Sequence, residues 1–425
     1  MLVTSADRWQ LAPGEVLSWR VRAGSTVTPA ELSVNQRNHL RGLPTIWLAA
    51  TFDVAGPVDV PALTAAYQAL IRRHSTLQCE LVWDGDEPRA VRHEPRELFC
   101  HPRPASTSDV AALLARECSP LSYPAFALAA VSRPDLSTVV IGFDHLHVDA
   151  HSIAIVAGEL HALYQDASRE LPPAGCFVSR AAEWSGAPRL SAHDPRLDPW
   201  LRTFEALDYE LPRCPAPLGL ADGEVAEQRT ELRALAGPDA AAALGHVARG
   251  AGTSTYGALL TSMAHALREA GASGPAPLLA PVQIRRAEDR ATVGWFTTTV
   301  PIIADTDLAV TAANVEQARR AAGVPLDQVL ASLPRPLRWT RRDAFMVSYV
   351  DYRRLPGTLD LLAPHHVSAT APTDDVQIWL SRTDSGVAAR VRFPHTATAR
   401  AFVDGLLELW SAAIDRLSAG SLTPA

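Results

Sequence analysis

The chain has 425 residues, which is too long for one small hydrophobic core and predicts two or three folding units. Its 47% hydrophobic and 20% charged residues are close to the averages of globular proteins, which excludes a largely disordered or fibrous chain. The net charge is −7, from 39 Lys and Arg against 46 Asp and Glu, and no block of like charges occurs. Nucleic acid and membranes are therefore not expected as partners.

The five cysteines are widely separated, and none forms the C-x-x-C spacing of zinc and redox motifs. The N-terminal residues lack the basic start and apolar run of a signal peptide, and no stretch of 18 apolar residues follows. These features predict a cytoplasmic protein with reduced thiols.

Hydrophobic periodicity predicts alternating strands and helices in the first part of the chain. The predicted strands are 44–54, 77–83 and 137–143, and the predicted helices run from after Asp59 to near His74 and over 152–165. The strand 137–143 is β-branched and uncharged, which is typical of a buried strand. It leads directly into a His- and Asp-rich segment, residues 144–151, before the second helix.

A run of prolines between residues 186 and 217 has few periodic apolar positions and predicts a crossover. We therefore expect an N-terminal half over 1–185, a crossover over 186–235 and a C-terminal half over 236–425. Both halves are expected to be α/β with mixed sheets. The C-terminal half predicts helices at 238–250, 254–270 and 397–418 and strands at 278–284, 295–303, 344–350, 376–381 and 387–393.

His145 is the candidate catalytic residue of the segment between the strand and the helix. A histidine held in one tautomer can act as a base near neutral pH, as acyl transfer to an amine or hydroxyl requires. The junction of a strand and a helix is rigid and can present a side chain to a cleft. Asp149 is expected to orient the segment by pairing with an arginine.

The motif Asp144-His145-Leu146-His147-Val148-Asp149-Ala150 resembles the His-His-x-x-x-Asp-Gly pattern of the condensation-domain superfamily, with the second His and the Asp retained. Three further segments resemble the same family in the same order. These are Asn35-Gln36-Arg37, Arg73-His74-Ser75-Thr76-Leu77 and Val293-Gly294-Trp295-Phe296-Thr297-Thr298-Thr299-Val300-Pro301. Together they span most of the chain.

The resemblance implies two chloramphenicol acetyltransferase-like halves in a V-shaped pseudo-dimer, with His145 in the middle as a general base or an aligning group. It implies a free-standing condensation enzyme of natural-product biosynthesis, such as nonribosomal peptide or antibiotic synthesis. An amine or alcohol would attack an acyl thioester, which gives an amide or an ester. The thioester would be carried by the phosphopantetheine arm of an acyl or peptidyl carrier protein or by coenzyme A, with no bound cofactor. Residues Pro13–Trp19 resemble free-standing actinobacterial acyltransferases, including those that acylate polyketides and glycolipids.

The sequence departs from the family pattern at several positions. Asp144 replaces the first His and is expected to face the cleft or solvent, and Ala150 replaces the Gly. Gln78 replaces an arginine that would pair with the motif Asp. The remaining candidates for the partner of Asp149 are Arg73, Arg285 and Arg286.

Substrate-binding candidates lie in two segments of the second half. Trp295 and Thr298 belong to the Gly-x-Phe segment, where Thr298 replaces the family's Asn. Ser348 and Asp351 lie on the strand where the family's epimerases carry Glu-Gly-His-Gly-Arg, and the absence of that segment favours transfer over epimerisation. Both residues are candidates for the acceptor side, although Asp351 is also suited to capping a turn.

Two other functions compete with acyl transfer. His145, His147, Asp149 and His151 alternate, so on an extended strand they would share one face and could bind a metal, as in a metallohydrolase. Alternatively, the two motif substitutions fit an inactive condensation-like module that recruits partner proteins. In the acyltransferase interpretation, His147 is packed inside and His151 begins the helix.

Overall fold

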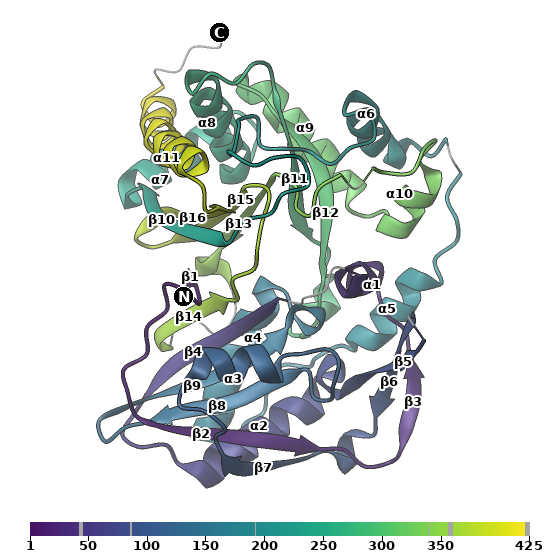
Figure 1. Cartoon of the computed structure of the whole chain (residues 1–425), viewed down its shortest axis with the longest axis vertical. Coiled ribbons are helices and arrows are strands. Elements are labelled where there is room, and N and C mark those ends of the chain that lie inside the picture. Colours follow the sequence, from purple (N-terminus) through teal and green to yellow (C-terminus); the bar gives the residue numbers. More distant parts are fainter. Residues whose placement is uncertain (42–45, 86, 192, 339, 356–359, 421–425) are drawn as a thin grey trace. The chain divides into compact units, whose positions relative to one another are not determined.

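A computed structural model describes residues 1–41, 46–85, 87–191, 193–338, 340–355 and 360–420. The chain forms two compact units (Figure 1). Unit 1 comprises Met1–Pro188, Arg285–Thr297 and Arg354–Thr370, and unit 2 comprises Arg189–Ile284, Thr298–Arg353 and the residues from Ala371 on. Two late segments of the chain thus belong to the first unit, which a division into contiguous halves does not anticipate.

Unit 1 contains a seven-stranded sheet of order β1-β14-β4-β9-β8-β2-β7 and a three-stranded sheet of order β3-β6-β5. Strand β14 arrives from late in the chain and pairs with β4 and β1. The elements are β1 (Leu2–Ser5), β2 (Glu15–Arg22), β3 (Val27–Ala30), α1 (Val34–Arg41), β4 (Trp47–Ala55), α2 (Val60–Arg73), β5 (Cys79–Asp84), β6 (Glu87–His93), β7 (Phe99–Pro104), α3 (Val110–Glu117), β8 (Phe126–Ser132), β9 (Leu136–Asp144), α4 (Ala150–Gln165), α5 (Phe177–Ser185) and β14 (Leu362–Ser368).

Strand β9 is central in this sheet and buried along nearly its whole length, as the sequence predicts. Successive side chains of β9 point to opposite faces of the sheet and pack in two different hydrophobic cores. Ile141 and Phe143 pack with apolar residues of α2 and α4, whereas Val140 packs with α3 on the other face. A Cβ at Gly142 would lie 2.4 Å from Leu114, so glycine at this position lets α3 pack closely against the strand. The buried strand therefore delivers residue 144 to a fixed place.

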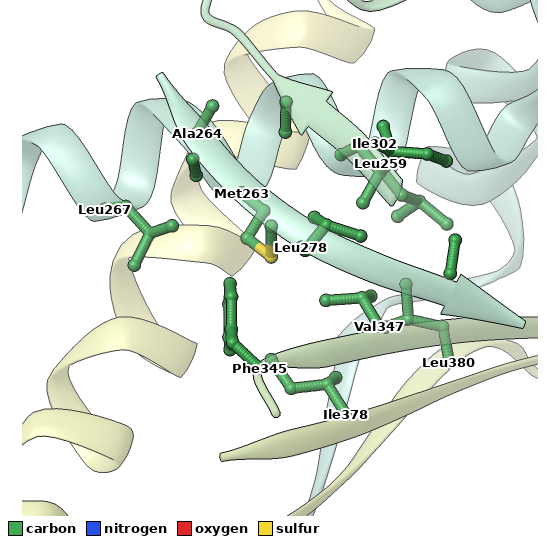
Figure 2. Close-up of a cluster of buried hydrophobic side chains, with 14 of the residues drawn as sticks. Leu259, Met263, Ala264, Leu267, Leu278, Ile302, Phe345, Val347, Ile378 and Leu380 are labelled. Carbon is green, nitrogen blue, oxygen red and sulfur yellow. The ribbon is translucent and has the colours of Figure 1, made fainter. Parts of the chain in front are cut away.

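Unit 2 contains a six-stranded sheet of order β10-β16-β15-β13-β11-β12. Its core joins α7, α8 and α11 to one face of this sheet, and Figure 2 shows Met263 and Leu267 near Leu278 and Phe345. The elements are α6 (Asp198–Ala206), β10 (Gln228–Ala236), α7 (Pro238–Gly250), α8 (Thr255–Glu269), β11 (Ala276–Gln283), β12 (Thr297–Ala304), α9 (Leu308–Ala321), α10 (Leu326–Ser332), β13 (Met346–Asp351), β15 (Gln377–Thr383), β16 (Gly386–Pro394) and α11 (Ala397–Ser418).

The mixed α/β class predicted from the sequence is confirmed, and so are the long helices. The bounds of α7 and α11 coincide with the predicted ranges, and α2 ends at Arg73, beside the predicted end. Residues 44–45 of the first predicted strand lie outside the described residues. The prediction of few periodic apolar positions in the crossover was wrong at α6, because Trp200 and Phe204 are both buried and stack at 5.9 Å.

A buried carboxyl group in unit 2 makes the stability of the protein depend on pH. Oδ1 of Asp375 accepts hydrogen bonds from the backbone N–H groups of Val376 at 2.7 Å and Cys214 at 3.1 Å. Its Oδ2 is buried and has no hydrogen-bond partner among the described residues. Burial raises the pKa of Asp375 to about 7, although these hydrogen bonds and the charge of Arg341 oppose the rise.

We expect Asp375→Asn to stabilise the protein above neutral pH. The folded-state pKa lies above the ordinary value of about 3.9, so the wild type loses stability as the pH rises through about 4 to 7. Asparagine keeps the acceptor oxygen but never ionises, so the gain should reach on the order of a few kcal/mol at pH 8 and vanish below about pH 4. Thermal unfolding across this range measures the difference, with the exposed Asp384→Asn as the control. An equal effect at all pH values would contradict the prediction.

Candidate active site

The backbone holds the junction between β9 and α4 at several points. Asp144 still pairs with Trp47 in the sheet, and the N–H of His145 donates to the carbonyl of Ile46 at 2.9 Å. Residues His145–His147 form one 3-10 turn, and Asp149 caps α4 by accepting from the N–H of Ser152 at 2.8 Å. The position of His145 is thus determined by a strand end, a turn and a helix cap.

His145 is partly buried, and its ring stacks on the indole of Trp295, with centroids 4.1 Å apart and planes at 28°. Nδ1 is buried and has no hydrogen-bond partner among the described residues. Burial lowers the pKa of His145 to about 4, and the charge of His39 acts in the same direction. The ring's own backbone carbonyl and the carboxylates of Asp144 and Asp149 oppose this change. His145 is therefore neutral at pH 7 and able to accept a proton.

Asp149 pairs with Arg285, which confirms the expected pairing with an arginine. The Nη1 to Oδ2 distance is 2.7 Å, and each side chain is only 3% exposed. The same oxygen accepts hydrogen bonds from the N–H of Phe296 and the hydroxyl of Thr297. Burial alone would raise the pKa of Asp149, but the charge of Arg285 and the hydrogen bonds from Arg285 and the Ser152 N–H hold it well below its ordinary value. The carboxylate is thus ionised and ties the cap of α4 to the segment 285–297.

Arg285 holds this segment through further contacts. Its Nη2 donates to the hydroxyl of Ser152 at 2.6 Å and to the carbonyl of Thr292 at 3.1 Å. Its guanidinium lies 4.4 Å from the ring centroid of Phe296. The pair thereby fixes the chain on either side of Trp295, the residue that stacks on His145.

The other two arginine candidates have different partners. Arg73 donates two hydrogen bonds to Glu159 of α4, and Arg286 lies 3.6 Å from Glu183 at the surface. Gln78, where the family has an arginine, donates to the carbonyl groups of Ile71 and Arg72. It therefore satisfies acceptors at the end of α2 and makes no ion pair.

Asp144 does not face the cleft or solvent, so that prediction was wrong. Its side chain is 0% exposed, because the residue still lies in the sheet at the end of β9. Oδ1 accepts from the N–H of Leu146 at 2.8 Å and lies 3.0 Å from Nε2 of His39. His39 was not a candidate, because it is 105 residues earlier in the chain and its helix α1 was not predicted.

The alternating histidines do not share a strand face. His145 and His147 lie in the 3-10 turn and His151 lies in the first turn of α4, where side chains no longer alternate. As predicted, His147 is buried, with Nδ1 3.1 Å from the hydroxyl of Thr76, and burial lowers its pKa to about 4. Over the described ranges, no three His, Cys, Asp or Glu side chains are grouped so as to hold a metal ion.

The structure brings three of the six predicted site residues together in unit 1, namely His145, Asp149 and Trp295. The other three belong to unit 2. Thr298 and Ser348 are buried on β12 and β13, and the Ser348 hydroxyl has no hydrogen-bond partner among the described residues. Asp351 ends β13, accepts from the N–H of Arg353 at 3.3 Å and pairs with its guanidinium, so the turn-capping interpretation is confirmed.

Unit 1 also contains a cavity of about 500 Å³ lined by the segment Trp9–Pro13, Arg133 and Thr138. Thr138 lies near the start of β9, whereas Asp144 ends it. The cavity is therefore at the opposite end of the strand from His145 and is not part of this site.

Comparison with known proteins places this geometry in a family. The family model described as "Condensation domain" matches residues 38–337. The chain belongs to the condensation-domain family. It is similar to the acyltransferase PapA3 of Mycobacterium tuberculosis, with 23% identity over 98% of this chain and 97% of the relative. It is also similar to the trehalose-2-sulfate acyltransferase PapA2 of Mycobacterium bovis, with 24% identity over 99% of this chain and 98% of the relative. This condensation-type enzyme is an acyltransferase.

Solved structures support the same fold. A PapA2 acyl transferase superimposes with a TM-score of 0.88 over 98% of this chain and 100% of that chain, at 21% identity. The condensation domain that mediates chain release from the enacyloxin polyketide synthase gives a TM-score of 0.66 over 93% and 85%, at 22% identity. The chloramphenicol acetyltransferase-like fold expected from the motif is thereby confirmed. In the part of the chain that the structure describes, no helix is long and apolar enough to span a bilayer.

Proposed function

We propose that this condensation-type acyltransferase uses His145 to transfer an acyl group from a thioester donor to the hydroxyl group of a small-molecule acceptor. The observation that carries the proposal is the His145 ring itself, which is neutral, partly exposed and held between a strand end and the Trp295 indole. Such a ring can accept a proton without first losing one. Asp149 and Arg285 act as positioning residues because they fix the backbone on both sides of the stack.

The reaction balances with one histidine. The acceptor oxygen attacks the thioester carbonyl carbon while His145 takes the hydroxyl proton on Nε2, since Nδ1 is buried. The tetrahedral intermediate then collapses, the carbon–sulfur bond breaks, and the leaving thiolate takes the proton from the imidazolium. An ester and a free thiol are the products, and the histidine returns to its starting state. An amine acceptor would give an amide by the same steps.

The donor and acceptor classes rest on the relatives. The name of trehalose-2-sulfate acyltransferase supports a hydroxyl acceptor and an ester product. The relative that mediates chain release from a polyketide synthase supports a donor thioester on the phosphopantetheine arm of a carrier protein, with coenzyme A as the alternative carrier. Either donor is a substrate, so the proposal requires no bound cofactor.

Intact-protein mass spectrometry tests this function. Acyl-loaded carrier proteins and acyl-coenzyme A are each incubated with a panel of alcohols and amines, with and without the enzyme and with and without a chelator. We expect enzyme-dependent loss of the acyl group from one donor class and formation of an ester, both unaffected by the chelator. Hydrolysis without an acceptor product, or activity that the chelator removes, would contradict the proposal and favour a hydrolase.

A further inference from the structure

We propose that the buried Asp144–His39 pair is a positioning device that holds Trp295 against His145 and sets the balance of charge around the His145 ring. One member of the pair, Asp144, replaces the first histidine of the family pattern. Neither residue of the pair is His145 or Asp149, the two motif residues that the proposed function uses. The functional consequence rests on the proposed role of His145, but the pair itself can be examined without turnover.

The geometry forms a continuous set of contacts from the carboxylate to the catalytic ring. Asp144 is fully buried, and its Oδ1 lies 3.0 Å from Nε2 of His39, whose side chain is 11% exposed. The His39 ring meets the Trp295 indole edge to face at 5.6 Å and 78°, and the His145 ring stacks on the same indole at 4.1 Å. The rings of His39 and His145 are 5.9 Å apart. Trp295 is therefore supported by two histidines, one of which is anchored by a buried acid.

The backbone on the far side of Trp295 is equally constrained. A Cβ on Gly294 would lie 2.2 Å from the Phe177 ring of α5, so the chain passes directly against that ring. The backbone is also held at Gly294, because its N–H donates a hydrogen bond to the Ser152 hydroxyl at 3.0 Å. These contacts fix the backbone of this segment, whereas the indole of Trp295 itself meets the rings of His39 and His145. The orientation of the indole thus depends on both histidines.

The charges that face His145 come from three elements. Helix α1 contributes His39, whose charge lowers the pKa of His145. The end of β9 contributes Asp144 and the cap of α4 contributes Asp149, and both raise it. Asp149 is already neutralised by Arg285, and Trp295 from the segment 285–297 is uncharged. Asp144 and His39 are therefore the two opposing charges that single substitutions can remove.

Removing the charge of His39 and removing that of Asp144 should shift the pKa of His145 in opposite directions. His39→Gln leaves the Asp144 carboxylate unopposed, so the pKa of His145 should rise. Asp144→Asn removes a charge that favours the imidazolium, so the pKa should fall, and the double variant should return toward the wild type. Loss of structure alone would expose the ring and raise the pKa in both single variants.

The experiment is an NMR titration of the histidine ring protons in the whole chain, with the His145 signal assigned from His145→Ala. As the pH is lowered, the His145 signal should shift first in His39→Gln, then in the wild type and last in Asp144→Asn. His93→Gln is the matched control, because Nε2 of His93 pairs with Glu80 at 2.8 Å on the three-stranded sheet. Circular dichroism establishes that each variant is folded. If His39→Gln does not fold, His39→Asn takes its place.

Opposite displacements support the inference, whereas equal displacements in one direction, or none, overturn it. The pH dependence of kcat/KM is then measured on the same variants. An acid limb that follows the NMR displacements supports both the pair's role and the proposed function. Opposite NMR displacements without any movement of the acid limb would leave the pair as described and instead remove His145 as the proton acceptor.

Discussion

Replacing His145 with alanine should reduce acyl transfer by about 10²–10⁴-fold while leaving the fold intact, since a positioned general base contributes on this scale. His145 is partly exposed and its Nδ1 has no hydrogen-bond partner within the described residues, so the fold should survive the loss of the ring and of its stacking on Trp295. The loss should be greater for an alcohol acceptor than for an amine that is already deprotonated. If His145 only aligns the acceptor, the loss will lie at the lower end of this range.

His147→Ala serves as the comparison in the same turn. Its ring is buried and contacts the Thr76 hydroxyl, so this variant should lose stability but keep most of its activity. Product formation by both variants is measured under identical donor loading, and circular dichroism monitors the fold. Wild-type turnover by a folded His145→Ala protein would remove the catalytic assignment of His145.

Replacing Asp149 with alanine should destabilise the protein by about 3–5 kcal/mol, because it leaves the Arg285 guanidinium buried without its counter-charge. The N–H groups of Ser152 and Phe296 lose an acceptor at the same time. For a unit of this size the melting temperature should fall on the order of 10 °C. Activity should fall as well, since the segment that carries Trp295 would lose its contacts with the Asp149 carboxylate and be held to α4 by fewer hydrogen bonds, such as those with the Ser152 hydroxyl.

A double-mutant cycle separates the ion pair from the other contacts. Asp149→Ala combined with Arg285→Met should cost less than the sum of the single changes, because the double variant buries no unpaired charge. Arg286→Met is the control, as the side chain of this exposed neighbour lies at a long 3.6 Å from the exposed Glu183 and its loss should change stability by less than about 0.5 kcal/mol. An unchanged melting temperature for Asp149→Ala would show that the pair is not structural.

Local patterns in the sequence were sufficient for the elements that carry the motif. The uncharged β-branched run at 137–143 forms the buried strand β9, and the apolar periodicity after Asp149 forms α4. These patterns are local because side-chain alternation and helical periodicity depend on neighbouring residues alone. The family motif added His145 and Asp149 as candidates, and the spacing of four residues between them places both at the same junction.

Pairing between distant segments was not accessible in the same way. Three arginines were candidates for Asp149, and the folding of segment 285–297 into unit 1 selected Arg285. Asp144 was expected to face the cleft or solvent, yet it is buried beside His39, whose Nε2 lies 3.0 Å from its carboxylate. The partner came from a helix with little apolar periodicity, so no local signal linked the two.

The sequence by itself therefore determined the α/β class, the long helices, the buried strand and the motif that indicates acyl transfer. The tertiary structure alone decided which charges meet around His145, that β14 and the segment 285–297 belong to unit 1, and that the alternating histidines do not share a face. The physical reason is that periodicity reports on residues a few positions apart, whereas a buried ion pair forms only where the whole chain brings opposite charges together and excludes water from them.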